Sequence, residues 1–374
     1  MTMTGPDVDV THRLRQAAAL VADAGWDSLL ISPGPDLRYL AGYEAVPLER
    51  LTCLIVPREG EGEPVLIAPL LERAAAAATP LGAAGVRIAT WTETDDPYAL
   101  VAEMIPGARH VGLDDHMWAV KVLALRDAMP AATQHAAGPV LARMRMRKSP
   151  AEVDALARAG AAIDWVHEQV PHLLKSGRTE REVGRDIAAL ILEAGHVSAD
   201  FVIVASGPNG ASPHHEVSDR VLTEGDAIVV DIGGTMPDGY CSDETRTYAI
   251  GDPGADYLRA YAALQRAQSE AVAAVKPGVP CEDIDAVARN LLVDEGLGEY
   301  FIHRTGHGIG LETHEEPYIV TGNALPLEPG MAFSVEPGFY IEGRWGARIE
   351  DIVVCGDEGP ALMNHRPREL LVVE

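Results

Sequence analysis

The chain has 374 residues, of which 47% are hydrophobic and 23% are charged, and its formal net charge is −26. This composition is ordinary for a folded protein of roughly two domains, and its acidic surplus argues against nucleic acid, which needs clustered Lys and Arg. No apolar run approaches the ~20 residues that span a bilayer, and four scattered cysteines without a Cys-x-x-Cys pair indicate reduced thiols in a cytoplasmic protein.

Helix and strand patterns alternate along the first part of the chain. Residues 11–24 have the apolar spacing of a helix, and residues 28–31 follow as a short buried strand. Two further strands are expected at residues 51–56 and 64–67, on either side of a polar turn. These elements predict a small α/β N-terminal domain over residues 1–140.

Two helix starts stand out in the remaining part, residues 141–374. Ser149 and Glu152 form a capping box with proline at the first helical position between them. Thr179 and Glu182 repeat the box before a second apolar helix, which a glycine ends. We therefore expect the larger domain to begin with two consecutive helices.

The larger domain also contains an internal repeat with a constant offset of 101 residues. Matching positions include Lys175 with Lys276, Gly177 with Gly278, and Gly195 with Gly296. Each half therefore contains a long helix, a Lys-x-Gly turn, a second helix and a glycine stop, followed by strands. Two such halves related by a pseudo-twofold axis would place a cleft between their sheets, whereas chance similarity of two amphipathic helices is the alternative.

One predicted hairpin carries two carboxylates. An apolar strand ends in Asp231, and after a turn the returning strand contains Asp243, so that the two side chains would lie side by side. Asp238 and Glu244 flank the second position and are alternatives to it. Both are interpreted as turn and surface acids.

Three later segments carry further polar groups that a scaffold does not need. His307 lies in Thr-Gly-His-Gly-Ile-Gly, and His314 follows seven residues later. Glu336 ends an apolar strand. In the last predicted strand, residues 347–354, the period of two directs Arg348 and Glu350 to one face.

Several carboxylates on apolar strands indicate bound cations, because unpaired buried charge is costly. Two divalent ions would balance four carboxylates and leave His307 as a neutral ligand. Oxygen-rich coordination with one imidazole favours manganese, cobalt or zinc, and a water between two such ions becomes a strong nucleophile. His303 lies four residues before His307, but no His-Glu-x-x-His motif is present, so His303 is interpreted as a structural histidine.

These segments resemble the metallopeptidase family of methionine aminopeptidase, aminopeptidase P and prolidase. The most specific stretches are Thr-Gly-His-Gly-Ile-Gly-Leu-Glu-Thr-His-Glu and Glu-Pro-Gly-Phe-Tyr, and the resemblance runs from about Ser149 to the C-terminus. The first domain resembles the creatinase-like domain of prolidases and aminopeptidases P. The resemblance implies an α+β fold, with a pita-bread catalytic domain of pseudo-twofold α/β halves (141–374) after a creatinase-like α/β domain (1–140).

The resemblance also implies roles for individual positions. Five residues would bind the two metal ions: Asp231, Asp243, His307, Glu336 and Glu350. His214 would lie at the substrate carbonyl or the hydroxide, and the adjacent His215 is the alternative. His314 would help polarise the scissile carbonyl, Arg348 would hold the ligand cluster, and Glu336 would also move a proton to the leaving nitrogen.

We therefore expect a dinuclear-metal peptidase that hydrolyses the Xaa-Pro bond of dipeptides through a metal-bridging hydroxide. Mn²⁺ is the first choice of metal, with Co²⁺ or Zn²⁺ as alternatives. An aminopeptidase P acting on longer Xaa-Pro-Yaa peptides is the alternative activity, because the metal ligands do not distinguish the two. A non-catalytic binding protein on the same fold is a second alternative. The resemblance further implies a homodimer that acts on short proline-containing peptides.

Overall fold

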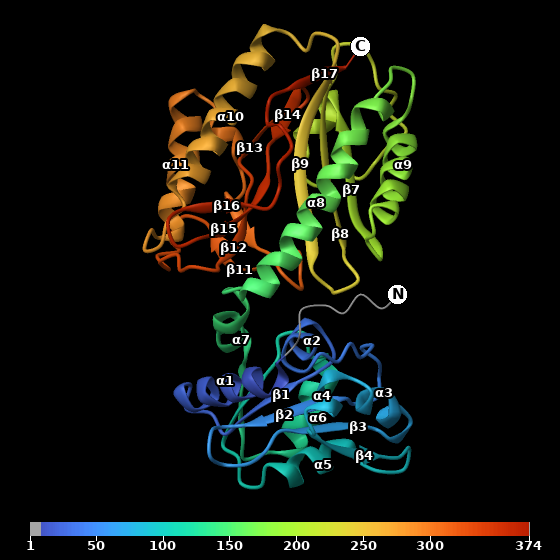
Figure 1. The fold of residues 1–374 in the computed structure, drawn as a ribbon, viewed down its shortest axis with the longest axis vertical. Coiled ribbons are helices and arrows are strands. Elements are labelled where there is room, and N and C mark those ends of the chain that lie inside the picture. The colour runs from blue at the N-terminus through green and yellow to red at the C-terminus, as the bar shows by residue number, and fades with distance from the viewer. Residues whose placement is uncertain (1–8, 374) are drawn as a thin grey trace. The chain divides into compact units, whose positions relative to one another are not determined.

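The computed structural model describes residues 9–373, which form two compact units, residues 9–145 and 146–373 (Figure 1). Each unit has its own sheets and its own hydrophobic core. Across residues 9–373, no helix combines the length and the apolar character that crossing a bilayer requires. All four cysteines are buried and free, as expected for reduced thiols.

The first unit is built on a six-stranded sheet in the order β4-β3-β2-β1-β5-β6. Antiparallel pairs join β1 to β2 and β2 to β3, and the other neighbours are parallel. The strands are β1 (Ser28–Ile31), β2 (Cys53–Pro57), β3 (Val65–Pro69), β4 (Arg87–Trp91), β5 (His110–Leu113) and β6 (Thr133–Ala136). The three strands expected from the sequence are confirmed, with small shifts of their ends.

Helices surround this sheet and complete the core of the first unit. Val101 and Leu125, from two of them, are fully buried against Leu30 and Ile55 of the sheet. The helices are α1 (Val10–Asp23), α2 (Pro35–Ala41), α3 (Arg73–Ala77), α4 (Pro80–Ala83), α5 (Pro97–Met104), α6 (Ala119–Ala128) and α7 (Gly138–Arg145), with a short 3₁₀ turn η1 (Leu70–Glu72). The unit extends a little past residue 140, because the Gly138-Pro139 pair opens helix α7.

The second unit begins with the two capped helices that the sequence predicts. Ser149 and Glu152 form the first capping box, and Thr179 and Glu182 form the second. The four long helices are α8 (Pro150–Leu173), α9 (Glu180–Glu193), α10 (Ala255–Ala274) and α11 (Cys281–Asp294). Both ends of α9 and α11 differ by 101 residues, which is the offset of the sequence repeat. The internal repeat is therefore confirmed as a repeat of structure.

Strands of the two halves lie between these helices, with α9 on one side and α10 and α11 on the other (Figure 1). One sheet has the order β17-β9-β8-β7, the other β11-β10-β12-β15-β16, and β13 pairs with β14. The strands are β7 (Ser198–Ser206), β8 (Ala227–Thr235), β9 (Cys241–Ile250), β10 (Gly306–Gly308), β11 (Glu315–Ile319), β12 (Ala332–Val335), β13 (Gly338–Ile341), β14 (Trp345–Arg348), β15 (Asp351–Cys355), β16 (Pro360–Leu362) and β17 (Leu371–Val373), with 3₁₀ turns η2 (Gly207–Ala211) and η3 (Gly298–Tyr300).

One predicted strand is interrupted. The sequence predicts a continuous strand over residues 347–354, whereas the structure divides it into β14 and β15. The reason is a change of partner, since β14 pairs with β13 and β15 pairs with β12. Glu350 lies at the break and forms an isolated bridge with Thr245 of β9, which joins the two halves.

Candidate metal centre

A cavity of about 1240 Å³ in the second unit brings the predicted site residues together. Its lining includes the five predicted ligands, Asp231, Asp243, His307, Glu336 and Glu350, together with His214, His314 and Arg348. These residues come from both halves of the repeat. The cleft expected between the two halves is therefore where the acids and histidines meet.

The hairpin of β8 and β9 places its two carboxylates on one face. Asp231 stands opposite Thr245, and Asp243 stands opposite Gly233, two positions along the strand. The carboxylates are therefore diagonal neighbours rather than directly opposed, which keeps them on the same side of the sheet. From the other half, β10 contributes His307 and the end of β12 contributes Glu336.

Predicted ligands from the two halves lie close together. His307 Nε2 lies 3.1 Å from Glu336 Oε1 and 3.7 Å from Asp243 Oδ2. Ligand atoms of Asp243, His307 and Glu350 all lie within 4.8 Å of one another. Two carboxylates and an imidazole thus converge on one point, with the remaining acids around the same cavity.

The electrostatics of this cluster fit a divalent cation. Burial, followed by the charge of Glu350, raises the pKa of Asp243 well above its usual value, and burial followed by Glu336 does the same for the pKa of Glu350. Asp231 Oδ1 is buried without a hydrogen-bond partner among the described residues. An excess of buried carboxylates with an unsatisfied oxygen is the donor set that a hard or borderline divalent metal compensates.

Arg348 is the protein's own counter-charge in the cluster. Its guanidinium pairs with Asp231 and donates to the hydroxyl of Tyr340 at 2.7 Å and to Thr245 Oγ1 at 3.2 Å. It also donates to the carbonyl of Pro213 at 3.3 Å, next to His214. The sequence assigned no role to Tyr340, although this residue closes the Glu-Pro-Gly-Phe-Tyr stretch.

Two further histidines of the cavity differ in what they contact. The ring of His314 meets that of His307 edge-on, with centroids 4.1 Å apart. Burial, followed by the proximity of His307, lowers the pKa of His314 to about 4, so that its imidazole is neutral at pH 7. His303 has both ring nitrogens engaged, by the carbonyl of Arg304 at 2.7 Å and by Tyr340 at 2.8 Å, as suits a structural histidine.

The neighbouring His214 and His215 differ in their contacts. His215 Nε2 lies 2.8 Å from the buried carboxylate of Glu180. The described residues make no hydrogen bond to the ring of His214, which lines the cavity beside His314. His214 is therefore the one whose ring is available to a ligand.

The expectation that Glu244 is a surface acid is wrong. Its side chain is fully buried 3.1 Å from Arg246, and burial raises its pKa well above the usual value. Strand β9 is buried along its whole length, so that alternation sends Asp243 toward the cavity and Glu244 to the opposite face. Asp238 does belong to the turn, where it accepts from the amide of Tyr240 at 3.2 Å.

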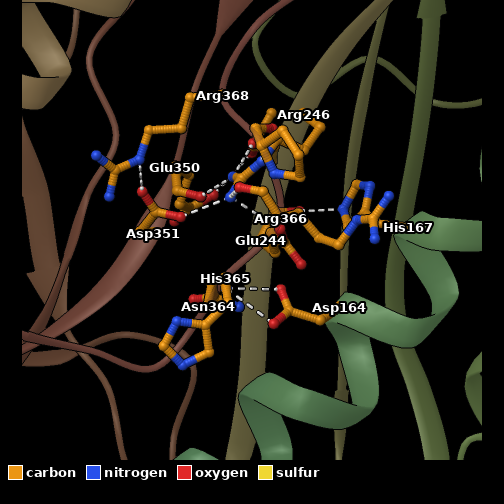
Figure 2. A network of polar contacts seen from close by, with 12 residues as sticks. Asp164, His167, Glu244, Arg246, Glu350, Asp351, Asn364, His365, Arg366 and Arg368 are labelled. Carbon is orange, nitrogen blue, oxygen red and sulfur yellow. Dashed lines mark hydrogen bonds and ion pairs between the residues drawn. The ribbon is translucent and has the colours of Figure 1, made fainter. Parts of the chain in front are cut away.

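A buried ionic network lies behind the cavity (Figure 2). Arg246 donates to Asp351 at 2.6 Å and to the carbonyl of Glu350, also at 2.6 Å. Asp351 accepts in addition from Gln268 at 2.7 Å and from Arg368 at 2.6 Å. Arg246 thus joins β9, which carries Asp243, to the segment that carries Glu350, a connection that no local sequence pattern indicates.

A second acidic group, in the first unit, is already engaged within the protein. Asp36, Asp114 and His116 offer ligand atoms within 4.8 Å of one another. However, Asp36 pairs with Arg145 at 2.8 Å, and Asp114 accepts from the amides of Ser32 and His116. This arrangement accounts for the two carboxylates without a metal.

Comparison with known proteins identifies the family. The family model of metallopeptidase family M24 matches residues 154–357, and that of the creatinase/prolidase N-terminal domain matches residues 13–147. The chain belongs to metallopeptidase family M24. It is therefore a metal-dependent peptidase with the α+β pita-bread fold, and the fold expected from the sequence is confirmed.

Several M24 relatives are similar over nearly the whole chain. The crystal structure of dipeptidase PepE from Mycobacterium ulcerans is 53% identical, with a TM-score of 0.94 and coverage of 99% of both chains. A recombinant prolidase from Thermococcus sibiricus is 36% identical, with a TM-score of 0.89 over 98% of this chain and 99% of the other. The Xaa-Pro dipeptidase of Lactobacillus helveticus is 34% identical over 94% of this chain and 96% of its own.

The carboxylate cluster predicts metal-dependent stability. Adding Mn²⁺ to chelator-treated protein should raise the melting temperature, because a ligand at 100 times its Kd stabilises the folded state by ~2.7 kcal/mol. Asp243→Asn should abolish this shift, while Asp238→Asn, which changes the neighbouring turn acid, should retain it. Differential scanning calorimetry and metal analysis test both. An undiminished shift in Asp243→Asn would show that the metal binds elsewhere.

The network behind the cavity predicts a large effect on stability. Arg246→Met would leave Asp351 and Glu244 buried without their shared cation, which should lower the free energy of unfolding by about 3–5 kcal/mol. Urea unfolding of the variant measures this loss. The matched control is Arg259→Met on the exposed face of α10, which should change stability by less than about 0.5 kcal/mol. A loss in Arg246→Met no larger than in the control would contradict the prediction.

Proposed function

We propose that this M24 peptidase is an Xaa-Pro dipeptidase. The observation that carries the proposal is the convergence of Asp243, His307 and Glu350 in a cavity that also contains His214 and His314. The names of its relatives support the substrate class, since they include a prolidase and an Xaa-Pro dipeptidase at 36% and 34% identity. A peptidase for such bonds has no substrate amide hydrogen to bind, because proline lacks it.

Five residues would hold two divalent ions, with Mn²⁺ the first choice and Co²⁺ or Zn²⁺ the alternatives: Asp231, Asp243, His307, Glu336 and Glu350. When bound, the ions supply Lewis acidity that polarises the scissile carbonyl and activates a water near neutral pH. The support for this assignment is the buried excess of carboxylates and the unpartnered Asp231 Oδ1.

The protein's own groups would orient the substrate and move the proton. Burial acts to raise the pKa of Glu336, but its hydrogen bond with His307 lowers the pKa to about 2. Glu336 would take the proton of the attacking water and deliver it to the proline nitrogen. The neutral His314 would donate an N–H to the carbonyl oxygen, with His214 beside it.

Arg304 is a candidate for the recognition of a dipeptide's carboxylate. Its guanidinium stacks 4.2 Å from the ring centroid of Tyr318 and lines the cavity. Arg348, the other arginine of the lining, is committed to Asp231. A cation beside the scissile-bond site would favour a substrate that ends in a free carboxylate after proline.

The proposal predicts chelator-sensitive release of proline from Ala-Pro. Proline release is measured from Ala-Pro and from Ala-Pro-Ala, first with Mn²⁺ and then after chelation. Preferential cleavage of the dipeptide establishes a dipeptidase, whereas preference for the tripeptide would make the protein an aminopeptidase P. Absence of cleavage in metal-loaded protein would contradict the proline assignment and favour a binding protein.

Glu336→Ala tests the two roles assigned to Glu336. This variant removes the proposed proton acceptor and one ligand together, so both activity and metal content should fall. Full activity with full metal content in Glu336→Ala would refute the scheme.

We also propose that the protein is a homodimer. Large apolar side chains are exposed on the first unit, including Val46 at 70%, Trp118 at 45% and Val120 at 63% exposure. Lys121 Nζ donates to the carbonyl of Leu48, which brings helix α6 close to the loop that carries Val46. Large apolar side chains exposed on neighbouring segments favour association.

The dimer proposal predicts a solution mass twice that of one chain, measured by light scattering. Val46→Asp should shift the mass toward that of the monomer, because a carboxylate in an apolar interface is costly to desolvate. A monomeric mass for the wild type at micromolar concentration would rule the dimer out.

A further inference from the structure

Glu180 is a buried carboxylate for which neither the fold nor the proposed reaction accounts. It is the first residue of α9, and the capping box that starts this helix uses Thr179 and Glu182. The side chain of Glu180 is nevertheless fully buried. Burying an ionised group is costly unless it is well hydrogen-bonded, so its partners indicate what it does.

Those partners all lie in the segment 206–218, which carries His214. One oxygen of Glu180 accepts from the amide of Ser206 at 2.8 Å and from its hydroxyl at 2.6 Å. The other oxygen accepts from the amide of Ser218 at 3.2 Å, from its hydroxyl at 2.6 Å and from His215 at 2.8 Å. Asn209 donates to both oxygens, at 3.0 and 3.1 Å. The carboxylate thus fastens both ends of the segment.

The bonds keep this carboxylate charged. Burial acts to raise the pKa of Glu180, but the hydrogen bonds from Ser206 and Ser218 lower it to about 2. Hydrogen bonds to an ionised acceptor are roughly twice as strong as neutral ones. An amide in place of the carboxylate could accept on only one side, since its NH₂ group would face donors.

The middle of the segment is held from the opposite direction. Arg348 donates to the carbonyl of Pro213 at 3.3 Å while it pairs with Asp231. His214 follows Pro213, and the adjacent His215 is bound to Glu180. Pro213 and His214 lie in a turn, so the bonds to Pro213 and to His215 hold His214 from both sides while its own ring lines the cavity.

We propose that Glu180 is a positioning residue that holds the segment 206–218 so that His214 faces the reacting carbonyl. The inference rests on the proposed peptidase function, in which His214 contacts the substrate. Glu180 itself touches neither metal ligands nor substrate, so its effect on the reaction passes through His214.

Asp285 of α11, in the other half of the repeat, provides a comparison. This carboxylate is also fully buried, and it accepts from the amide of Thr305 at 3.1 Å, from its hydroxyl at 2.8 Å and from Thr321 at 2.7 Å. Thr305 is two residues from the predicted ligand His307. Asp285→Asn should therefore lower metal content, whereas Glu180→Gln should leave metal content unchanged.

A double-mutant cycle tests the proposal on Ala-Pro hydrolysis. The proteins compared are the wild type, Glu180→Gln, His214→Ala and the double variant, each analysed for kcat, KM and bound metal. Glu180→Gln should lower kcat on the order of 10–100-fold through misplacement of His214, with metal retained. In the His214→Ala background, the same change should cost less than about twofold, because the residue through which it acts is already absent.

Two outcomes would overturn the proposal. Either the kcat losses of the two single variants multiply in the double variant, or Glu180→Gln keeps the kcat of the wild type. If circular dichroism shows that Glu180→Gln does not fold, Ser218→Ala takes its place in the cycle, because it removes one donor to the same carboxylate. The expected loss of kcat is then smaller, and it again should not multiply with the loss caused by His214→Ala. Failure of metal-loaded wild type to cleave Ala-Pro would instead overturn the proposed function, and this inference with it.

Discussion

Buried negative charge at the junction of the two halves is the constraint on which the second unit depends. Asp231, Asp243, Glu336 and Glu350 line one cavity, and Arg348 pairs with Asp231 among them. Carboxylates at such a site are costly to bury unless cations compensate them. We propose that divalent metal ions complete this junction, which would couple metal binding to the stability of the folded state.

The residues around the cluster hold the proposed metal ligands in place and are not themselves proposed as ligands. Arg246 ties the strand of Asp243 to the segment of Glu350, and Arg348 links Asp231 to Tyr340. These bonds restrict the positions of ligands that come from different strands. Sites of this kind need their supporting contacts to be as well defined as the ligands themselves.

The repeat explains how a site of this complexity arises from simple units. The first half contributes Asp231 and Asp243 from one hairpin, while the second contributes His307 from β10 and Glu336 directly after β12. Neither half contains a complete ligand set. The cavity therefore exists only when both halves are folded against each other, and the bridge between Thr245 and Glu350 marks this contact.

The sequence by itself determined the features that depend on local order. Capping boxes at Ser149 and Thr179 and the repeat of 101 residues follow from spacing along the chain, and the structure confirms them. The acids predicted for the site could be recognised because charged residues in apolar strands are conspicuous, whereas the roles of His214 and His314 came from the resemblance to the family. The structure gathers them in one cavity, although their individual roles stay predictions.

Only the tertiary structure decided which partners the side chains next to the site residues have. Glu244 is buried against Arg246 because β9 is covered on both faces, and the strand expected over residues 347–354 breaks because its two parts pair with different strands. His215 is bound by Glu180, 35 residues earlier in the chain. Such partners are invisible to local patterns, because burial and hydrogen bonding are set by segments that meet only on folding.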